Sequence, residues 1–317
     1  MTEASKHVFD RYHVRKTKKQ KDGFIEYIKT YAEEKGYSVR VEKANFGARN
    51  VVIGSPESAK AVYTAHYDTC PRLPFPNFIT PKNFFYYIVY QLIITVLLIA
   101  VIIAAASGLS LIVGVVAKLM WQNEEIAGSA ISFTWTFGYF LVLYLLMNGP
   151  ANKHTANDNT SGVITLLEIM DALPQEHREK IAFVFFDLEE MGLIGSQGFA
   201  SKHKATMKDK LVLNFDCVSD GNNILFAVRK GASAYVPALS KAYVSNEAYN
   251  VDIAAKGVFY PSDQANFKAG VGVASLKYSK KLRTLYMDRI HTNRDVIFDE
   301  ANIEFLTDGA IRLARDL

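Results

Sequence analysis

The sequence predicts an α/β fold, a three-layer sandwich whose central sheet is mostly parallel, interrupted by an inserted pair of apolar helices. In residues 1–82 and 153–317, short and almost continuously apolar runs alternate with amphipathic segments. This alternation is typical of buried parallel strands joined by helices. Residues 83–152 carry only three of the 68 charged side chains, and the other 247 residues carry 65. We therefore expect one discontinuous domain, 1–82 with 153–317, and one inserted apolar hairpin, 83–152.

The part before the insertion predicts one helix and three strands. Residues 20–35 predict a helix because their apolar side chains fall on one stripe and a glycine follows them. Strands are expected at residues 37–41, 50–53 and 59–65. The basic segment 11–21 allows two interpretations, a surface for anionic lipid headgroups or a plain solvated segment.

Two uncharged runs, residues 84–117 and 126–152, make up most of the insertion. A bilayer core needs about 20 apolar helical residues, so each run predicts a membrane-spanning helix. A buried core helix or a hydrophobic lid is the alternative. The first span is expected to end or loosen at residues 107–110, and the link 118–130 predicts the turn between the spans. Both ends of such a transmembrane hairpin return to the same side of the membrane.

The charges around the hairpin predict its orientation. Lys82 and Lys153, with Arg72 further out, flank the side of the main domain, whereas Lys118 marks the far side. The positive-inside bias then places the main domain in the cytoplasm, anchored to the cell membrane by two spans. The first 25 residues contain no apolar run, so no cleavable secretion signal is expected.

Composition excludes other classes of protein. A net charge of +4 without an aromatic and basic module predicts no nucleic-acid partner. Two cysteines do not form a disulfide framework in a chain of this size, which favours a reducing compartment. We expect Cys217 to be a small buried residue and Cys70 to be partly exposed, without a role. Five histidines are expected at the surface: His7, His13, His154, His177 and His203.

After the insertion, helices and strands alternate. The expected elements are a helix at 162–173, a strand at 180–186, a helix at 194–203, a strand at 211–215 and a final helix at 301–315. Polar residues stand directly after three of the apolar strands: His66 with Asp68, Glu189 with Glu190, and Asp216. Ligands collect at the carboxyl ends of such strands, and clustered carboxylates need a cation. The pattern predicts a divalent metal site.

The spacing of His66 from Asp68, and of Glu189 from Glu190, suggests a different role for each member of the pair. Side chains alternate in an extended chain, so His66 and Asp68 face the same way and Asp68 can accept the second ring N–H of the histidine. The neighbours Glu189 and Glu190 point differently, which lets one bind metal while the other stays free as a base.

Two further segments complete a specific pattern. ANDNTSG presents Asp158 beside a helix start, and HTNRD contains His291 and Asp295. With them, the chain resembles the zinc exopeptidases of the leucyl aminopeptidase, aminopeptidase Y and glutamate carboxypeptidase II type, metallopeptidase family 28. The family's His-x-Asp, Asp-x-x-Ser-Gly, Glu-Glu, Asp and His-Thr pattern is present in order, and YPSDQANF resembles its Ser-Asp-x-x-x-Phe segment. The resemblance covers residues 20–82 and 153–315.

The resemblance implies a zinc-exopeptidase fold and two Zn²⁺ ions, with Co²⁺ or Mn²⁺ as alternative metals. Five residues would hold the ions: His66 and Asp216 one of them, Glu190 and His291 the other, and Asp158 both. Glu189 would be the general base that activates a metal-bridging water, and Asp68 would orient the site. The implied activity is an aminopeptidase that hydrolyses N-terminal peptide or amide bonds, and the apolar insertion, in which this chain departs from the family, predicts that it is anchored in the membrane.

The insertion lies between His66 and Asp158, which must reach the same metals, so the chain must cross the membrane an even number of times. A catalytic cleft near the bilayer suggests a hydrophobic peptide or amide substrate. Two other functions are considered: an amide hydrolase, deacylase or cyclase acting on a non-peptide or modified amine, and a receptor-like protein without catalysis. Retention of every ligand and of Glu189 favours an enzyme. Oligomeric state and side-chain preference are left open.

Overall fold

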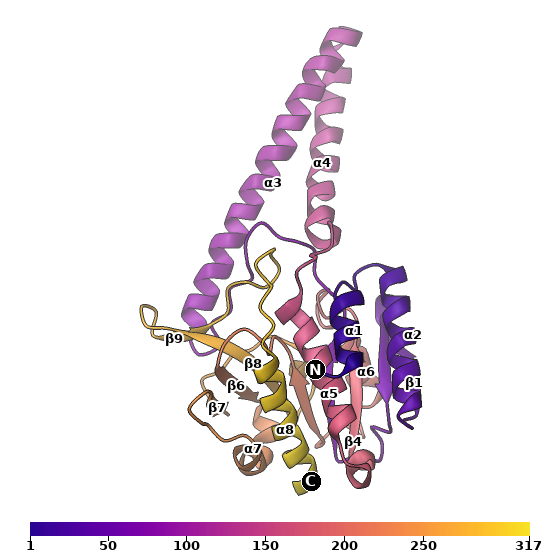
Figure 1. Ribbon diagram of the computed structural model, residues 1–317. Helices are drawn as coiled ribbons and strands as arrows, with labels where there is room; N and C mark the ends of the chain where they lie inside the picture. The colour runs from indigo at the N-terminus through magenta and orange to yellow at the C-terminus, as the bar shows by residue number, and fades with distance from the viewer. The chain divides into compact units, whose positions relative to one another are not determined.

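A nine-stranded mixed sheet forms the centre of the domain in the computed structural model (Figure 1). The structure describes residues 1–146 and 148–317 in full and Met147 by its backbone. The strand order is β1-β2-β4-β3-β5-β8-β6-β7, and β9 pairs with β8. The strands are β1 Val39–Lys43, β2 Arg49–Ile53, β3 Ala61–His66, β4 Ile181–Phe186, β5 Leu211–Phe215, β6 Asn223–Val228, β7 Asn250–Ala254, β8 Gly270–Ser279 and β9 Thr284–Tyr286.

The centre of the sheet is parallel and its two sides are mixed. Strands β4, β3, β5 and β8 run parallel to one another. The pairs β1–β2, β2–β4 and β6–β8 are antiparallel. His66 pairs with Phe186 in the β3–β4 register, so both strands end at the same level. The predicted α/β class with a mostly parallel sheet is confirmed, and the register brings the residues after β3 and β4 to one edge.

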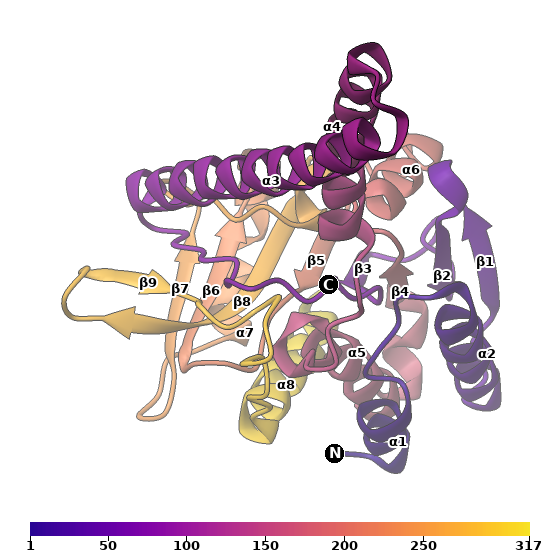
Figure 2. The same ribbon diagram turned by 90° about the horizontal axis from the view of Figure 1, so that it is seen from above.

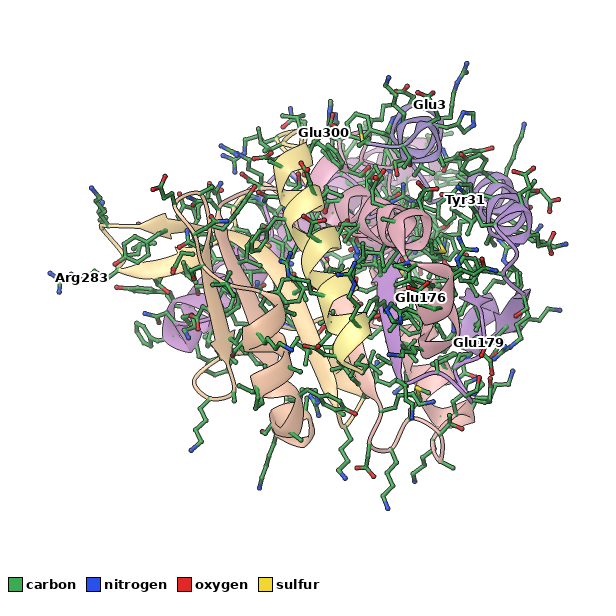
Figure 3. All side chains as sticks on the ribbon, turned by 60° about the horizontal axis from the view of Figure 1, so that its bottom comes forward. Glu3, Tyr31, Glu176, Glu179, Arg283 and Glu300 are labelled. Atoms are coloured by element: carbon green, nitrogen blue, oxygen red, sulfur yellow. The ribbon has the colours of Figure 1, made fainter. Side chains whose placement is uncertain are left out.

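Helices cover both faces of the sheet (Figure 2). One apolar core joins the sheet to α1 Glu3–Arg11, α2 Lys18–Glu34, α5 Gly162–Ala172, α7 Val236–Ala242 and α8 Glu300–Asp316. A second core joins the opposite face to Phe199 of α6 Ile194–Lys202. Charged side chains such as Glu179, Glu300 and Arg283 lie on the outside (Figure 3).

Most predicted elements form within two residues of the expected bounds. Helix α2 begins with a complete capping box between Thr17 and Gln20, and its apolar stripe is buried as expected. Helices α1 and α7 and strands β6, β7 and β8 were not predicted from their local sequence patterns. Contacts with distant parts of the chain supply the stability that these local patterns lack.

The contacts divide the chain into two units, Met1–Phe84 with Ala151–Leu317, and Phe85–Pro150. The second unit consists of helix α3, Phe84–Trp121, from residue 85 on and helix α4, Glu124–Asn148. Both helices are long and apolar enough to cross a membrane, and only 11% and 6% of their most apolar windows are buried.

The expected break at residues 107–110 was wrong. Helix α3 runs on to Trp121, because a glycine inside a helix costs only about 1 kcal/mol; within the helix the Ser110 hydroxyl donates to the Ser107 carbonyl (2.9 Å). The turn is also shorter than residues 118–130, since α4 starts directly after its cap Asn123. The indole of Trp135 donates to the Ser107 hydroxyl (3.1 Å), which joins the two helices.

Candidate active site

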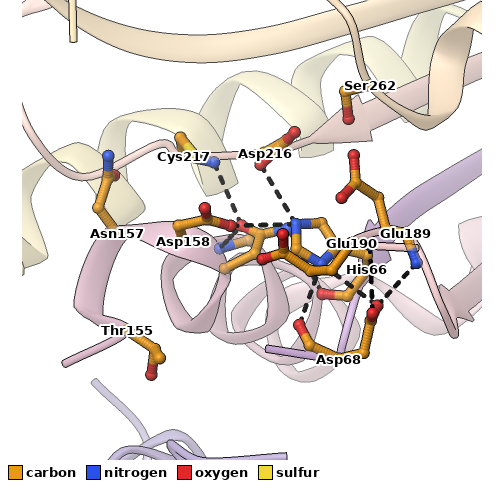
Figure 4. Close-up of polar contacts among 12 residues, drawn as sticks. His66, Asp68, Thr155, Asn157, Asp158, Glu189, Glu190, Asp216, Cys217 and Ser262 are labelled. Carbon is orange, nitrogen blue, oxygen red and sulfur yellow. Dashed lines mark hydrogen bonds and ion pairs between the residues drawn. The ribbon is translucent and has the colours of Figure 1, made fainter. Parts of the chain in front are cut away.

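The seven predicted site residues come together at the carboxyl ends of β3, β4 and β5. Asp158, Asp216, Glu189 and Glu190 surround the ring of His66 (Figure 4). His291 reaches the same place from the loop before α8, and Asp68 follows β3. Residues more than 200 positions apart in the chain therefore share one buried cluster.

Asp158 stands between the two histidines. One of its carboxylate oxygens lies 3.3 Å from Nε2 of His66, and the other lies 3.1 Å from Nε2 of His291. Asp216 lies 3.5 Å from His66, and Glu190 lies 3.2 Å from His291. The cluster thus has two halves that share one carboxylate.

Asp68 supports the site differently from our expectation. Nδ1 of His66 is 3.2 Å from the backbone carbonyl of Asp68, whereas the Asp68 carboxylate is 3.6 Å away. That carboxylate instead accepts the backbone N–H groups of Glu189 (3.0 Å) and Glu190 (3.2 Å). The carbonyl of Asp68 therefore orients the histidine, and its carboxylate holds the Glu189–Glu190 turn.

Asp295 does the same for Asp158, a role that the sequence pattern did not indicate. Its two oxygens accept the backbone N–H groups of Asn157 (2.8 Å) and Asp158 (3.0 Å). Its place four residues after His291 was the available signal, but the pairing joins segments 137 and 138 positions apart.

Asn159 locks the turn after Asp158 to the strand ends. Its side-chain oxygen accepts the N–H groups of Gly162 (3.0 Å) and Cys217 (3.2 Å), and its amide donates to the carbonyl of Phe215 (3.0 Å). A Cβ at Gly162 would collide with the Asn159 side chain and the Phe215 carbonyl. A glycine is therefore required where the turn enters α5.

The N-terminal segment packs against the strand ends that carry the site. Two cations of the basic segment 11–21, Arg15 and Lys21, are buried there and cannot bind lipid headgroups. Arg15 is buried and donates to the carbonyls of Tyr67 and Tyr12. Lys21 is buried in an ion pair with Asp187, which directly follows β4. Both side chains brace the strand ends that carry the site.

The segment after Cys70 holds the His291 loop in place. The N–H of Leu73 donates to the carbonyl of His291 (2.8 Å), and Ile79 pairs with Met287. His291 itself has a left-handed backbone, with φ of 66°, a conformation that a non-glycine residue keeps only when its surroundings impose it.

The burial of the two cysteines and of one histidine outside the cluster can be compared with the sequence prediction. Cys217 is buried as predicted, but the expected exposure of Cys70 was wrong, because its side chain is buried too. The expectation of a surface position was also wrong for His203, which is buried against Glu42.

The electrostatics of the cluster favour a cation. Burial raises the pKa of Glu189 well above its usual value, although His66 opposes the shift. Burial alone would raise the pKa of Asp158, but hydrogen bonds from His291 and His66 outweigh it and lower that pKa. Burial raises the pKa of Asp295 to about 8, and the charge of Asp158 adds to the shift. So many carboxylates in one buried place repel each other unless positive charge joins them.

The donor set fits zinc. Imidazole nitrogens and carboxylate oxygens are ligands that zinc accepts. Within the part of the chain whose side chains are described, Oε1 of Glu190 is buried without a hydrogen-bond partner, and Oδ1 of Asp216 is buried with only the ring of His66 at 3.5 Å beside it. An unpaired buried carboxylate oxygen is costly, so these two atoms are suited to a metal ion.

A buried set of histidines and carboxylates at the ends of parallel strands is a donor set suited to a divalent metal ion. The profile of peptidase family M28 matches residues 143–309, which is more than half of the chain. The chain therefore belongs to peptidase family M28, as the sequence resemblance predicted.

Known proteins support this placement. The probable leucine aminopeptidase 2 of Aspergillus oryzae is 38% identical over 82 residues, which cover 25% of this chain and 16% of that protein. The Zn-dependent exopeptidase of Parabacteroides distasonis superposes with a TM-score of 0.57 at 15% identity, over 99% of this chain and 97% of that one. The glutaminyl cyclase of Bacteroides thetaiotaomicron gives 0.57 at 17% identity, with the same coverage. At these identities the two superpositions show a common fold.

Proposed function

We propose that this protein is a membrane-anchored aminopeptidase with two zinc ions. The observation that carries the proposal is the position of Asp158, whose two oxygens each face a different histidine. A carboxylate placed this way can bridge two ions, with His66 and Asp216 on one side and Glu190 and His291 on the other. When bound, zinc supplies Lewis acidity that polarises the scissile carbonyl and makes a water nucleophilic near neutral pH.

The residues around the metal site would carry the proton transfers. Glu189 takes a proton from the attacking water and delivers it to the leaving amine. The raised pKa of Glu189, caused by burial and by nearby carboxylates, suits a group that must both accept and release a proton. Asp68 keeps Glu189 and Glu190 in different roles because it fixes both of their backbone N–H groups.

A cavity of about 640 Å³ supports an apolar substrate side chain. Leu193, Val258, Phe259 and Tyr260 line one part of it, whereas Arg229, Lys230 and Lys256 line another part. The hydroxyl of Tyr260 donates to the backbone carbonyl of Asp216 (3.0 Å), so this wall is tied to a proposed ligand. We infer that the residue at the substrate's amino terminus is hydrophobic.

The activity is tested on the full chain with a panel of aminoacyl amides and their N-acetylated counterparts. We expect hydrolysis of apolar free-amine substrates, none of acetylated ones, and loss of activity with a chelator that zinc reverses. Activity that survives the chelator would refute the mechanism. Cleavage of acetylated substrates would instead favour the deacylase alternative, and cyclisation of an N-terminal glutaminyl peptide would favour a cyclase.

The apolar unit supports the membrane anchor and the division of the chain into residues 1–82 with 153–317 and 83–152. Helices whose apolar side chains stay exposed are suited to lipid rather than to a soluble core. A cytoplasmic catalytic domain follows from the positive-inside bias, although Lys82 forms an ion pair with Asp252 (2.9 Å). A reporter inserted after Asn123 is expected outside the cell. A cytoplasmic signal there would reverse the orientation.

A further inference from the structure

Cys70 is a thiol that the proposed mechanism does not use, yet it lies inside the site. Its side chain is 1% exposed. Its sulfur, an oxygen of Glu190 and a nitrogen of His291 lie within 4.8 Å of one another. His66, Asp158 and Asp216 form a second group with the same spacing. The two groups correspond to the two halves of the cluster, and only the first contains sulfur.

The backbone holds Cys70 beside His291 from two sides. The N–H of Asn152 donates to the carbonyl of Cys70 (3.1 Å), and Pro71 forms a bridge with Ala151. Two residues further on, the Leu73 N–H donates to the carbonyl of His291 (2.8 Å). The thiol and the imidazole therefore belong to one hydrogen-bonded frame, as donors to a single ion require.

An unpaired oxygen of Glu190 points independently to a cation on this side. Oε2 of Glu190 is 3.2 Å from His291, but Oε1 is buried and makes no hydrogen bond to any residue with a described side chain. The Glu190 side chain is only 8% exposed. A buried carboxylate oxygen without a partner costs free energy that a bound cation would remove.

We propose that Cys70 is a ligand of the zinc ion held by Glu190 and His291. The inference rests on the zinc site proposed above. Zinc lies about 2.3 Å from sulfur and about 2.0 to 2.2 Å from nitrogen or oxygen, so neighbouring ligand atoms of a tetrahedral site are roughly 3.3 to 3.6 Å apart. The three atoms, which lie within 4.8 Å of one another, would have to approach by up to about 1 Å when the ion binds. On coordination the metal replaces the thiol proton, which passes to the solvent.

A thiolate would make the two halves of the site unequal. With the shared Asp158, the Cys70 half offers four protein donors, which completes a tetrahedral zinc site. The His66 half offers three and keeps a position open for the substrate. Because soft thiolate ligands favour zinc over manganese, we also expect the Cys70 half to discriminate against Mn²⁺.

Cobalt substitution tests the sulfur ligand without relying on activity. The full chain is purified in detergent, stripped of metal and titrated with Co²⁺. We expect a thiolate-to-cobalt charge-transfer band in the near ultraviolet for the wild type, and its loss in Cys70→Ser. Cys217→Ser is the matched control, because Cys217 is equally buried and stands next to Asp216, and it should keep the band. A band that survives Cys70→Ser, or that disappears in Cys217→Ser, would overturn the assignment.

X-ray absorption of the zinc-loaded wild type covers the case in which Cys70→Ser does not fold. We expect a sulfur shell at about 2.3 Å, and a shell of nitrogen and oxygen alone would contradict the proposal. A chelator-sensitive aminopeptidase without any sulfur signal would refute the role of Cys70 alone. A sulfur signal in a protein that cleaves none of the amides would refute the proposed activity and leave the Cys70 ligand standing.

Discussion

At the scale of single residues, two buried aspartates organise the site without belonging to the proposed ligand set. Asp68 accepts two successive N–H groups from the turn that carries Glu189 and Glu190. Asp295 does the same for the turn that carries Asp158. Both carboxylate oxygens of each aspartate accept hydrogen bonds from backbone N–H groups. Each aspartate therefore fixes the backbone of a turn rather than one side chain.

Asp295→Asn should weaken zinc binding, because an amide has only one oxygen to accept the two N–H groups. Loss of such a supporting partner typically costs about 10- to 100-fold in metal affinity. The measurement is competition for zinc with a chelator of known affinity. Asp299→Asn is the control: Asp299 caps α8 by accepting the Ala301 N–H, and asparagine caps equally well. Equal zinc affinity in both variants would contradict the role of Asp295.

Glu189→Gln and Glu190→Gln should fail in different ways. Loss of a general base predicts a fall in kcat of about 10²- to 10⁴-fold in Glu189→Gln, with zinc content unchanged. Glu190→Gln should instead lower the zinc content, because Glu190 contacts His291 and has the unpaired oxygen. Parallel kinetics and metal analysis separate the two. The reverse pattern would exchange the roles of the neighbouring glutamates.

At the scale of elements, β1 and α6 are joined by a charge cluster around the buried Glu42, which contains none of the site residues. Glu42 on β1 contacts Lys202 (2.9 Å) and His203 (2.9 Å) at the end of α6, and Arg40 (2.8 Å) on its own strand. Burial alone would raise the pKa of Glu42, but hydrogen bonds from Lys202, His203 and Arg40 lower it to about 2. The charged form of Glu42 therefore stabilises the folded state.

The lowered pKa gives stability a defined pH dependence. A carboxyl with a folded pKa of about 2 and an ordinary value of 4.5 contributes fully above pH 4.5 and loses its contribution as the pH falls to about 2. Glu42→Gln should thus lower the free energy of unfolding by about 1.5 to 3 kcal/mol at pH 7, and the difference should shrink in acid. Thermal melts across this range test it, with the exposed Glu176→Gln as control. If the difference in stability between the wild type and Glu42→Gln did not depend on pH, the charge of Glu42 would not be its cause.

Helix α8 packs against the ring of Tyr243 at a glycine. A Cβ at Gly309 would overlap that ring, with Cζ at 2.7 Å. Alanine is favoured over glycine in a helix by about 1 kcal/mol, but overpacking of a core typically costs about 1 to 3 kcal/mol, so Gly309→Ala should lower the melting temperature. The exposed neighbour Asp308→Ala should not. A stabilised Gly309→Ala would mean that the ring moves away freely.

At the scale of the whole molecule, the apolar unit is inserted into the domain and not appended to it. The contact boundaries fall at Phe84 and Ala151. Both flanks belong to the domain: Lys82 pairs with Asp252, and the N–H of Asn152 donates to Cys70. Because the flanks are fixed by the domain's own contacts, the insertion is a candidate for removal without loss of the site.

Replacing residues 85–150 with a short glycine and serine linker should move the protein from the membrane fraction to the soluble fraction, with zinc content preserved. Fractionation of cells expressing both forms, followed by metal analysis, tests this. Activity on soluble aminoacyl amides should be retained, whereas activity on long hydrophobic peptides should fall if substrates approach along the bilayer. A full chain found in the soluble fraction would refute the anchor.

The sequence by itself determined strands β1 to β5, most helices and the residue types of the site. Local patterns carry that information: β3, β4 and β5 are short apolar runs, and polar residues directly follow them. The family pattern placed Asp158 and His291 in the same site because their order along the chain is specific. The exposed positions of α3 and α4 follow from the same kind of local information, an almost uncharged composition.

Only the tertiary structure decided which residues contact and support one another in the site. The support of Asp158 by Asp295, the burial of Arg15 beneath the site and the position of Cys70 beside Glu190 and His291 are contacts between distant segments. A hydrogen bond or a ligand cluster depends on distance in space, and neither composition nor periodicity encodes which distant residue will fill a given position. Asp68 illustrates the difference: its spacing from His66 predicted a partner for the imidazole, but the fold brought two backbone N–H groups closer to its carboxylate.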